Sequence, residues 1–154
     1  MTKTTVRTDI LKDIEKRLNS EPACIGTVRK DKKTLIFGLT VGTYSTKNFV
    51  RISRSGMSVH TMASFEASEK KTDEIIRYFN EQNSILRQGK FFVIGELLVF
   101  QNHIVLLPGQ KADMDEMMEL ILICPRMMAG ASGDIRAIIE GTEEEENEYV
   151  IQED

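Results

Sequence analysis

The hydrophobic pattern of the first fifth of the chain is helical. Ile10, Leu11, Ile14 and Leu18 follow residues that commonly cap helices, and their spacing places them on one side of a helix. Charged side chains occupy the other side. The pattern therefore predicts a helix from about residue 9 to 19, with one apolar face directed at a core.

Short runs rich in β-branched and aromatic residues follow. The run before residue 42 contains Gly38, which indicates a β-bulge or a close backbone approach. The small and polar residues at 42–48 predict a loop, and Ser55-Gly56 is typical of a two-residue hairpin turn. These signals predict four strands: 24–29, 34–41, 49–54 and 57–64.

The stretch from Asp73 to Leu107 joins an amphipathic helix to the most apolar hairpin of the chain. Thr72 or Asp73 is suited to cap the helix, and Gly89 to end it. The two hairpin arms, 90–94 and 97–107, are apolar at nearly every position. Such arms are buried on both faces over part of their length, or they face a partner.

Asn83 falls on the apolar stripe of this helix, where a core residue is expected. A buried amide must find hydrogen-bond partners. We therefore expect Asn83 to bond the backbone of the following turn or hairpin, with a binding role as the alternative.

The last third of the chain predicts two helices and a tail. Asp113 is suited to cap a helix that Pro125 ends or kinks, and Ser132, after the breaker 130–133, is suited to cap a short second helix. Residues 142–154 are acidic, and a run of Glu buries too little apolar surface to offset chain entropy. We expect a mobile tail there.

The resulting order is α-β-β-β-β-α-β-β-α. Because strands and helices do not alternate strictly, the order favours an α+β fold with an antiparallel sheet over a parallel one. We expect a single domain over residues 1–141, followed by the tail.

Charge and composition narrow the classes of partner. The net charge is -4, but residues 141–154 hold seven acids and no base, so the rest of the chain carries -4 + 7 = +3. That basic charge is too small and dispersed to predict nucleic-acid binding. No apolar run approaches the roughly 20 residues of a membrane helix, and no signal-peptide pattern opens the chain. We expect a cytoplasmic protein that binds neither nucleic acid nor membrane.

The central stretch resembles the YbjN family. The resemblance is carried by IIRYFNEQN at 75–83, KFFV at 90–93, GEL at 95–97 and a closing helix with an acidic start, and it covers roughly residues 52 to 141. Members of that family share the fold of type III secretion chaperones, with helices packed on one face of the sheet. The resemblance implies a homodimeric binding module with a chaperone-like or regulatory role, and it brings no catalytic residue.

The residues that could catalyse a reaction or bind a metal are better explained by structural roles. His60 and His103 lie in predicted strands without the spaced partners that a metal or catalytic site needs. GASGD at 130–134 differs from a nucleophile elbow, because Asp134 stands where that motif has glycine. Cys24 and Cys124, far apart, are read as small buried hydrophobes rather than a disulfide. We predict no catalytic residue, no metal site and no cofactor.

The acidic helix start has two readings. Asp113, Asp115, Glu116 and Glu119 could bind a cation, but they lack the loop spacing of a calcium site. They are better explained as complements to the helix dipole.

The methionines are the most suggestive feature, since five fall within residues 114–128. Methionine is flexible and suits surfaces that accept varied apolar partners, although plain core packing of this helix is the favoured explanation. The predicted partner or dimer surface combines this helix with the apolar hairpin: Met114, Met117, Met118, Ile121, Phe100 and Val105.

Two functions follow as hypotheses. The first is a non-enzymatic module that forms a homodimer and binds an unidentified protein segment, by adding a strand or by apolar docking. The alternative is a small-ligand-binding protein or an enzyme with a site of scattered residues around His60 or His103. The acidic tail, with Tyr149-Val150-Ile151 inside it, is a further candidate interaction arm.

Overall fold

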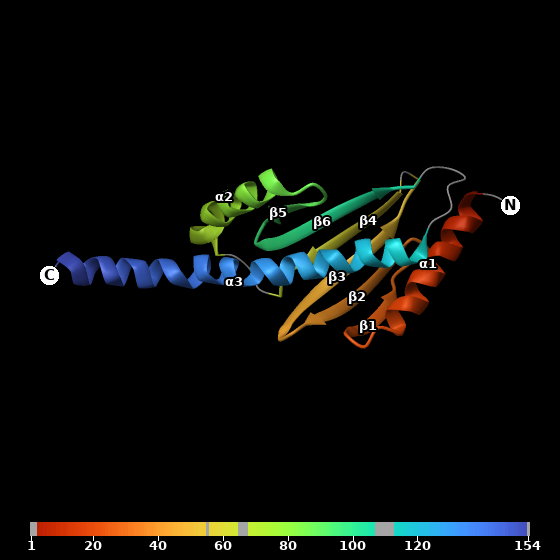
Figure 1. The fold of residues 1–154 in the computed structure, drawn as a ribbon, viewed down its shortest axis with the longest axis horizontal. Coiled ribbons are helices and arrows are strands. Elements are labelled where there is room, and N and C mark those ends of the chain that lie inside the picture. The colour runs from red at the N-terminus through yellow and green to blue at the C-terminus, as the bar shows by residue number, and fades with distance from the viewer. Residues whose placement is uncertain (1–2, 55, 65–67, 107–112, 154) are drawn as a thin grey trace.

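The computed structural model describes residues 3–54, 56–64, 68–106 and 113–153, and side chains within these ranges between residues 10 and 141. It is an α+β fold built on one six-stranded antiparallel sheet of order β1-β2-β3-β4-β6-β5, which confirms the predicted class and element order (Figure 1). The elements are α1 Lys3–Asn19, β1 Cys24–Arg29, β2 Thr34–Val41, β3 Tyr44–Ile52, β4 Gly56–Met62, α2 Glu69–Ile85, β5 Lys90–Ile94, β6 Leu97–Val105 and α3 Met114–Glu153.

The helices pack on one face of the sheet. Strict alternation along β2 buries Leu35, Phe37 and Leu39, and their partners on β3 point to the same side. α3 runs across the middle of this face, while α1 lies near β1 and α2 near β5 (Figure 1). The hydrophobic core fills the space between the helices and this covered face.

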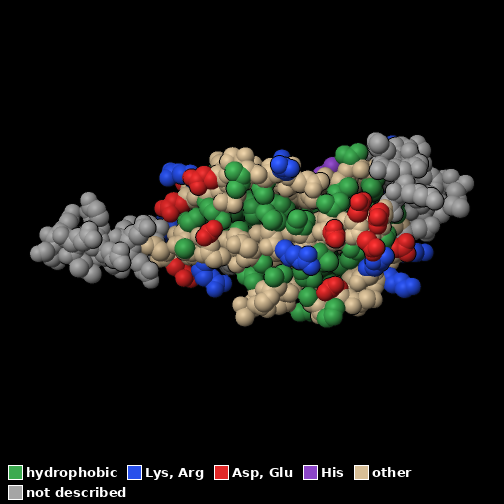
Figure 2. All heavy atoms as spheres, in the orientation of Figure 1, with side chains coloured by type: hydrophobic (Ala, Val, Ile, Leu, Met, Phe, Trp, Pro, Cys, Tyr) green, Lys and Arg blue, Asp and Glu red, His purple; other side chains and the backbone are tan. Residues whose placement is uncertain are grey.

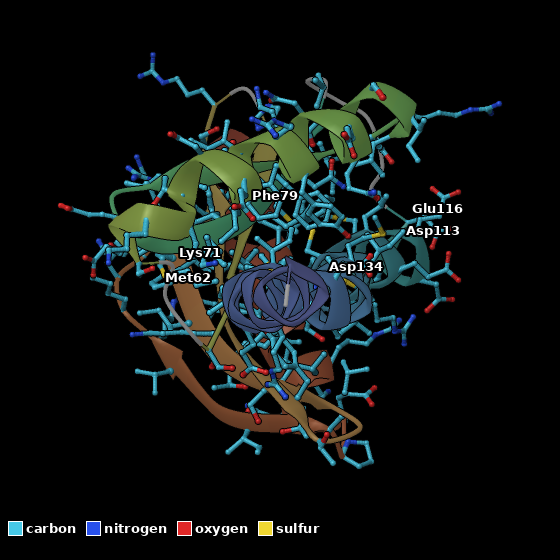
Figure 3. All side chains as sticks on the ribbon, turned by 90° about the vertical axis from the view of Figure 1, so that its left-hand side faces the viewer. Met62, Lys71, Phe79, Asp113, Glu116 and Asp134 are labelled. Atoms are coloured by element: carbon cyan, nitrogen blue, oxygen red, sulfur yellow. The ribbon has the colours of Figure 1, made fainter. Side chains whose placement is uncertain are left out.

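An aromatic chain joins α2 to the sheet. Phe79 of α2 is buried and stacks on Phe91 of β5 at 5.0 Å between ring centroids, and Phe91 meets Phe100 of β6 edge-on at 4.8 Å. Tyr78 donates a hydrogen bond of 2.8 Å to a carboxylate oxygen of Asp134 on α3. Figure 3 shows Phe79 and Asp134 on facing sides of the layer between α2 and α3.

β3 begins earlier than the sequence predicted. The expected loop at 42–48 is wrong from Tyr44 onward, because Thr46 and Asn48 lie in the strand and face the core. Asn48 Nδ2 donates to Thr46 Oγ1 at 3.0 Å, and Thr61 Oγ1 donates to Asn48 Oδ1 at 2.6 Å. These buried polar groups satisfy one another, which a pattern of apolar residues cannot reveal.

The break predicted in α3 is also wrong. The helix passes through Pro125, Gly130 and Gly133, and Ser132 donates to the carbonyl of Ala129 instead of capping a new helix. Burial along one side of α3 overrides the local signals, since helix stability in proteins comes mainly from tertiary packing. The helix also continues through 142–153, where a mobile tail was expected; the side chains there lie outside the described ones.

Other helix and strand boundaries also differ from the predicted ones. α1 starts at Lys3 rather than near residue 9, and α2 starts at Glu69, before the expected Thr72 or Asp73. Asp113 caps α3 as predicted, because its Oδ1 accepts the backbone N–H of Asp115 at 3.0 Å. β4 begins at Gly56, while Ser55 and Pro108-Gly109 lie outside the described residues.

Candidate functional site

The predicted partner surface does not form one surface. Met117, Met118, Ile121 and Phe100 were predicted to lie on a partner or dimer surface, but they are buried in the core, where they hold α3 on the sheet. Met128 on the same side of α3 is also buried. The core explanation therefore accounts for most of the methionine cluster, because methionine fills irregular gaps between a helix and a twisted sheet.

The two remaining predicted residues lie apart. Met114 is half-buried in an open groove between α1 and α3, next to Lys16 and Ser20. Across this groove Arg17 Nη1 pairs with Asp115 Oδ1 at 2.6 Å, an exposed ion pair of small energetic value. Val105 is 61% exposed and lies on the opposite face of the sheet.

That opposite face, which we name the open face, consists of the outward-pointing residues of the six strands. The helices pack on the other side, and Figure 3 shows the sheet with α3 along only one of its sides. Many outward side chains are nevertheless apolar, and most of them are exposed or half-buried. These are Ile25, Val28, Ile36, Phe49, Met62, Phe92, Ile94, Leu97, Val99 and Val105.

The register places several of these side chains next to one another on neighbouring strands. One row crosses the sheet through Val28, Ile36 and Phe49 to His60 and Gln101. Directly paired residues in an antiparallel sheet have their side chains within contact distance. The apolar side chains of the open face therefore form two clusters among polar residues, one of Val28, Ile36 and Phe49 and one of Met62, Val99 and Phe92. Contiguous apolar patches on a protein surface mark interaction sites.

The charge of the open face has one sign. None of the six strands contains an Asp or Glu, whereas Lys47, Arg51 and Lys90 point outward from it. Lys47 Nζ lies 5.5 Å from the ring centroid of Phe49, within the range of a cation–π contact. In contrast, Figure 2 shows acidic and basic side chains interspersed on the helix-bearing side.

One acid approaches this face from its rim. Asp31, in the turn between β1 and β2, has a pKa lowered mainly by the hydrogen bond from the Lys33 N–H, with a smaller contribution from the charge of Arg51. Arg51 is therefore partly compensated. Lys47 and Lys90 lie further from that turn in the strand register.

Both histidines lie on the open face. His60 is half-buried, and its pKa is lowered because burial removes water from the charged imidazolium. His103 Nδ1 lies 2.8 Å from Ser58 Oγ on the neighbouring strand. This pair has no carboxylate on any of the strands to orient the imidazole, as a nucleophilic triad requires.

Metal-ligating side chains do not cluster in the described part of the chain: no group of three or more His, Cys, Asp or Glu comes together there. Cys124 is buried, and burial raises its pKa to about 12. Neither Cys124 nor the half-buried Cys24 forms a disulfide. None of the described helices has the length and apolar character to span a membrane.

The two edges of the sheet are both obstructed. At the β5 edge, the Asn83 amide bonds the backbone N–H and carbonyl of Phe91, each at 2.8 Å. At the β1 edge, the register is interrupted between Ile25 and Val28, where Gly26 has φ +63°. Bulges and covered edges discourage the addition of another strand. Docking on the open face is therefore favoured over strand addition.

Sequence reasoning missed the open face as a unit. The resemblance implied helices on one face of the sheet, and the predicted alternation assigned wetter positions to one side of β3 and β4, but neither showed that apolar side chains would also gather on the uncovered side. The usable signal was the absence of acids from the strands, in a chain with 24 of them.

Comparison with known proteins adds no relative: no family model, no curated protein and no solved structure matches this chain.

Proposed function

We propose that this protein is a non-enzymatic protein-binding module that uses the open face as its binding surface. The observation that carries the proposal is the sheet face left without a helix, on which apolar side chains gather in two clusters. Removing such apolar area from water is the main favourable term in protein association. The obstructed edges direct a partner to this face.

The module acts as a homodimer in this proposal, in the cytoplasm, with the chaperone-like or regulatory role that the resemblance to the YbjN family implies. The open face suits a two-fold dimer, because the symmetry covers the same surface on both copies at once. The alternative, a small-ligand site or an enzyme around His60 or His103, rests on the Ser58–His103 contact alone.

Photo-crosslinking tests the surface. A photoreactive phenylalanine analogue replaces Phe49 on the open face, and a matched control replaces Ile85, which is 74% exposed at the end of α2. We expect protein adducts from position 49 and few from position 85. Equal adducts from both positions, or none from position 49, would contradict the proposal.

Sedimentation tests the homodimer. We expect the wild-type chain to sediment as a dimer at micromolar concentration, and Phe49→Ser to weaken the dimer. Ile123→Ser is the control, because Ile123 is exposed on the helix-bearing side. A strictly monomeric wild type at high micromolar concentration would count against the homodimer.

A further inference from the structure

Assuming the proposed function, the charge of the open face identifies its occupant. The face offers apolar side chains framed by bases, and its strands hold no acid. An occupant should therefore combine carboxylates with apolar side chains. Complementary charge steers association and suppresses wrong partners, which gives specificity to an otherwise apolar contact.

The chain itself contains a segment of this chemistry. Residues 142–154 read TEEEENEYVIQED, with seven acids, no base, and Tyr149-Val150-Ile151 in between. This pattern matches the open face in both respects: the carboxylates complement Lys47, Arg51 and Lys90, and the Tyr-Val-Ile group complements the apolar cluster around Phe49.

The segment is carried away from the open face of its own molecule. α3 lies on the covered face, and its last buried residue in the described part is Ile135. The remaining turns run past the end of the sheet to the C-terminus (Figure 1). At about 1.5 Å per residue, the 40 residues of α3 span about 60 Å, roughly twice the length of a nine-residue strand. The overhang is therefore available to another molecule.

We infer that residues 142–154 of one copy bind the open face of a second copy, and that two copies exchange these segments reciprocally. Reciprocal exchange closes a two-fold dimer and leaves neither open face uncovered. The second contact forms within an already joined pair, so a modest affinity per segment suffices.

A charge swap in the full-length chain tests this exchange. The face swap is Lys47→Glu with Arg51→Glu, and the tail swap is Glu144→Lys with Glu146→Lys. We expect each swap alone to raise the dimer dissociation constant by at least about tenfold at low salt. Both swaps in one chain should return it to within about threefold of wild type, because attraction is restored with the signs exchanged.

The control is Lys12→Glu with Arg126→Glu, which changes the net charge equally on exposed positions of α1 and α3. We expect no weakening. A synthetic peptide of residues 142–154 gives a readout without any substitution: in excess, it should dissociate the wild-type dimer, and less effectively as salt is raised.

The outcomes separate the two proposals. If the tail swap and the peptide leave the dimer unchanged while Phe49→Ser disrupts it, the exchange is overturned and the open face still stands as the interface. If Phe49→Ser, the swaps and the peptide all have no effect, both proposals fail. Binding of a labelled single-stranded RNA that is lost in the face swap, with a dimer insensitive to the tail swap, overturns the exchange in favour of a nucleic-acid surface.

Discussion

The side-chain amide of Asn83 hydrogen-bonds both backbone groups of Phe91. Nδ2 donates to the Phe91 carbonyl and Oδ1 accepts the Phe91 N–H, each at 2.8 Å. β5 is the last strand of the sheet, so the amide takes the place that a further strand would occupy. One residue of α2 thus fixes the helix to the hairpin and occupies the edge at Phe91.

Asn83→Leu should destabilise the protein. Leucine keeps a similar size but leaves the N–H and carbonyl of Phe91 without these partners, which costs about 1–3 kcal/mol in the free energy of unfolding. Urea denaturation followed by circular dichroism measures the change. Asn80→Leu is the control, because Asn80 is exposed on the same helix and should change stability little. Equal losses of unfolding free energy in both variants would show that the hydrogen bonds of Asn83 to Phe91 are not the cause.

The Asn83 contact was predictable, whereas the full length of β3 and the continuity of α3 were not. An amide on an apolar helical stripe must find partners, and the hairpin came next in the chain. Thr46 and Asn48, by contrast, look like loop residues, because the sequence does not reveal their buried hydrogen bonds to Leu39 of β2 and Thr61 of β4. Gly130 and Gly133 look like breakers because sequence does not reveal that the sheet supports the helix around them.

The open face, too, could not be predicted from any single strand or helix. Alternation in β2, β3 and β4 predicts two unlike faces, and the buried set Leu35, Val50 and Val59 confirms which one faces the core. Which face the helices cover follows from chain connections and packing over long sequence distances. Pattern analysis of single elements therefore gave the strands but not the surface.

Glycines in α3 offer a stabilising substitution. A Cβ added at Gly130 or Gly133 meets nothing within 4 Å, and both residues are helical. Gly130→Ala and Gly133→Ala should each raise the free energy of unfolding by about 0.5–1 kcal/mol, because alanine loses less backbone entropy on folding. Thermal denaturation measures the gain.

Gly56→Ala provides the opposite case. Gly56 has φ +151°, and a Cβ there would overlap the carbonyl oxygen of Ile104 on β6. We expect a clear loss of stability, since the β4–β6 pairing must shift.

A Gly133→Ala variant less stable than wild type would contradict the prediction made for the glycines of α3. It would indicate that another surface packs against this side of the helix.

The pair Asn48 and Thr61 should behave as a coupled unit. Thr61→Val leaves Asn48 Oδ1 without its 2.6 Å donor, and Asn48→Leu leaves the buried Thr61 hydroxyl without that acceptor. Each should cost about 1–3 kcal/mol. The double variant should cost less than the sum, because removing both partners leaves fewer unsatisfied groups. A double-mutant cycle from urea unfolding measures the coupling, and strict additivity would argue against it.

The two thiols should differ in reactivity. Burial raises the pKa of Cys124 to about 12, so only about one in ten thousand molecules carries the thiolate at pH 8. Cys24 is half-buried near Thr27 Oγ1, at 3.2 Å. With a chromogenic disulfide reagent, we expect one thiol to react in the folded protein and the second only in urea. In Cys24→Ser the first reaction should disappear; its persistence would place Cys124 at an accessible site.

His60 should make stability depend on pH in a defined direction. Its folded-state pKa lies below the value near 6.5 of an unfolded chain, because burial disfavours the charged imidazole. As pH falls, the unfolded state therefore takes up the proton first. The contribution of His60 to stability is fully present above about pH 6.5 and is lost as pH falls through the folded pKa.

Urea unfolding between pH 7.5 and 5.5 should show a free energy of unfolding that declines toward acid. His60→Gln should flatten this decline, whereas His103→Gln at an exposed position should retain it. An unchanged slope in His60→Gln would mean that another group controls the decline.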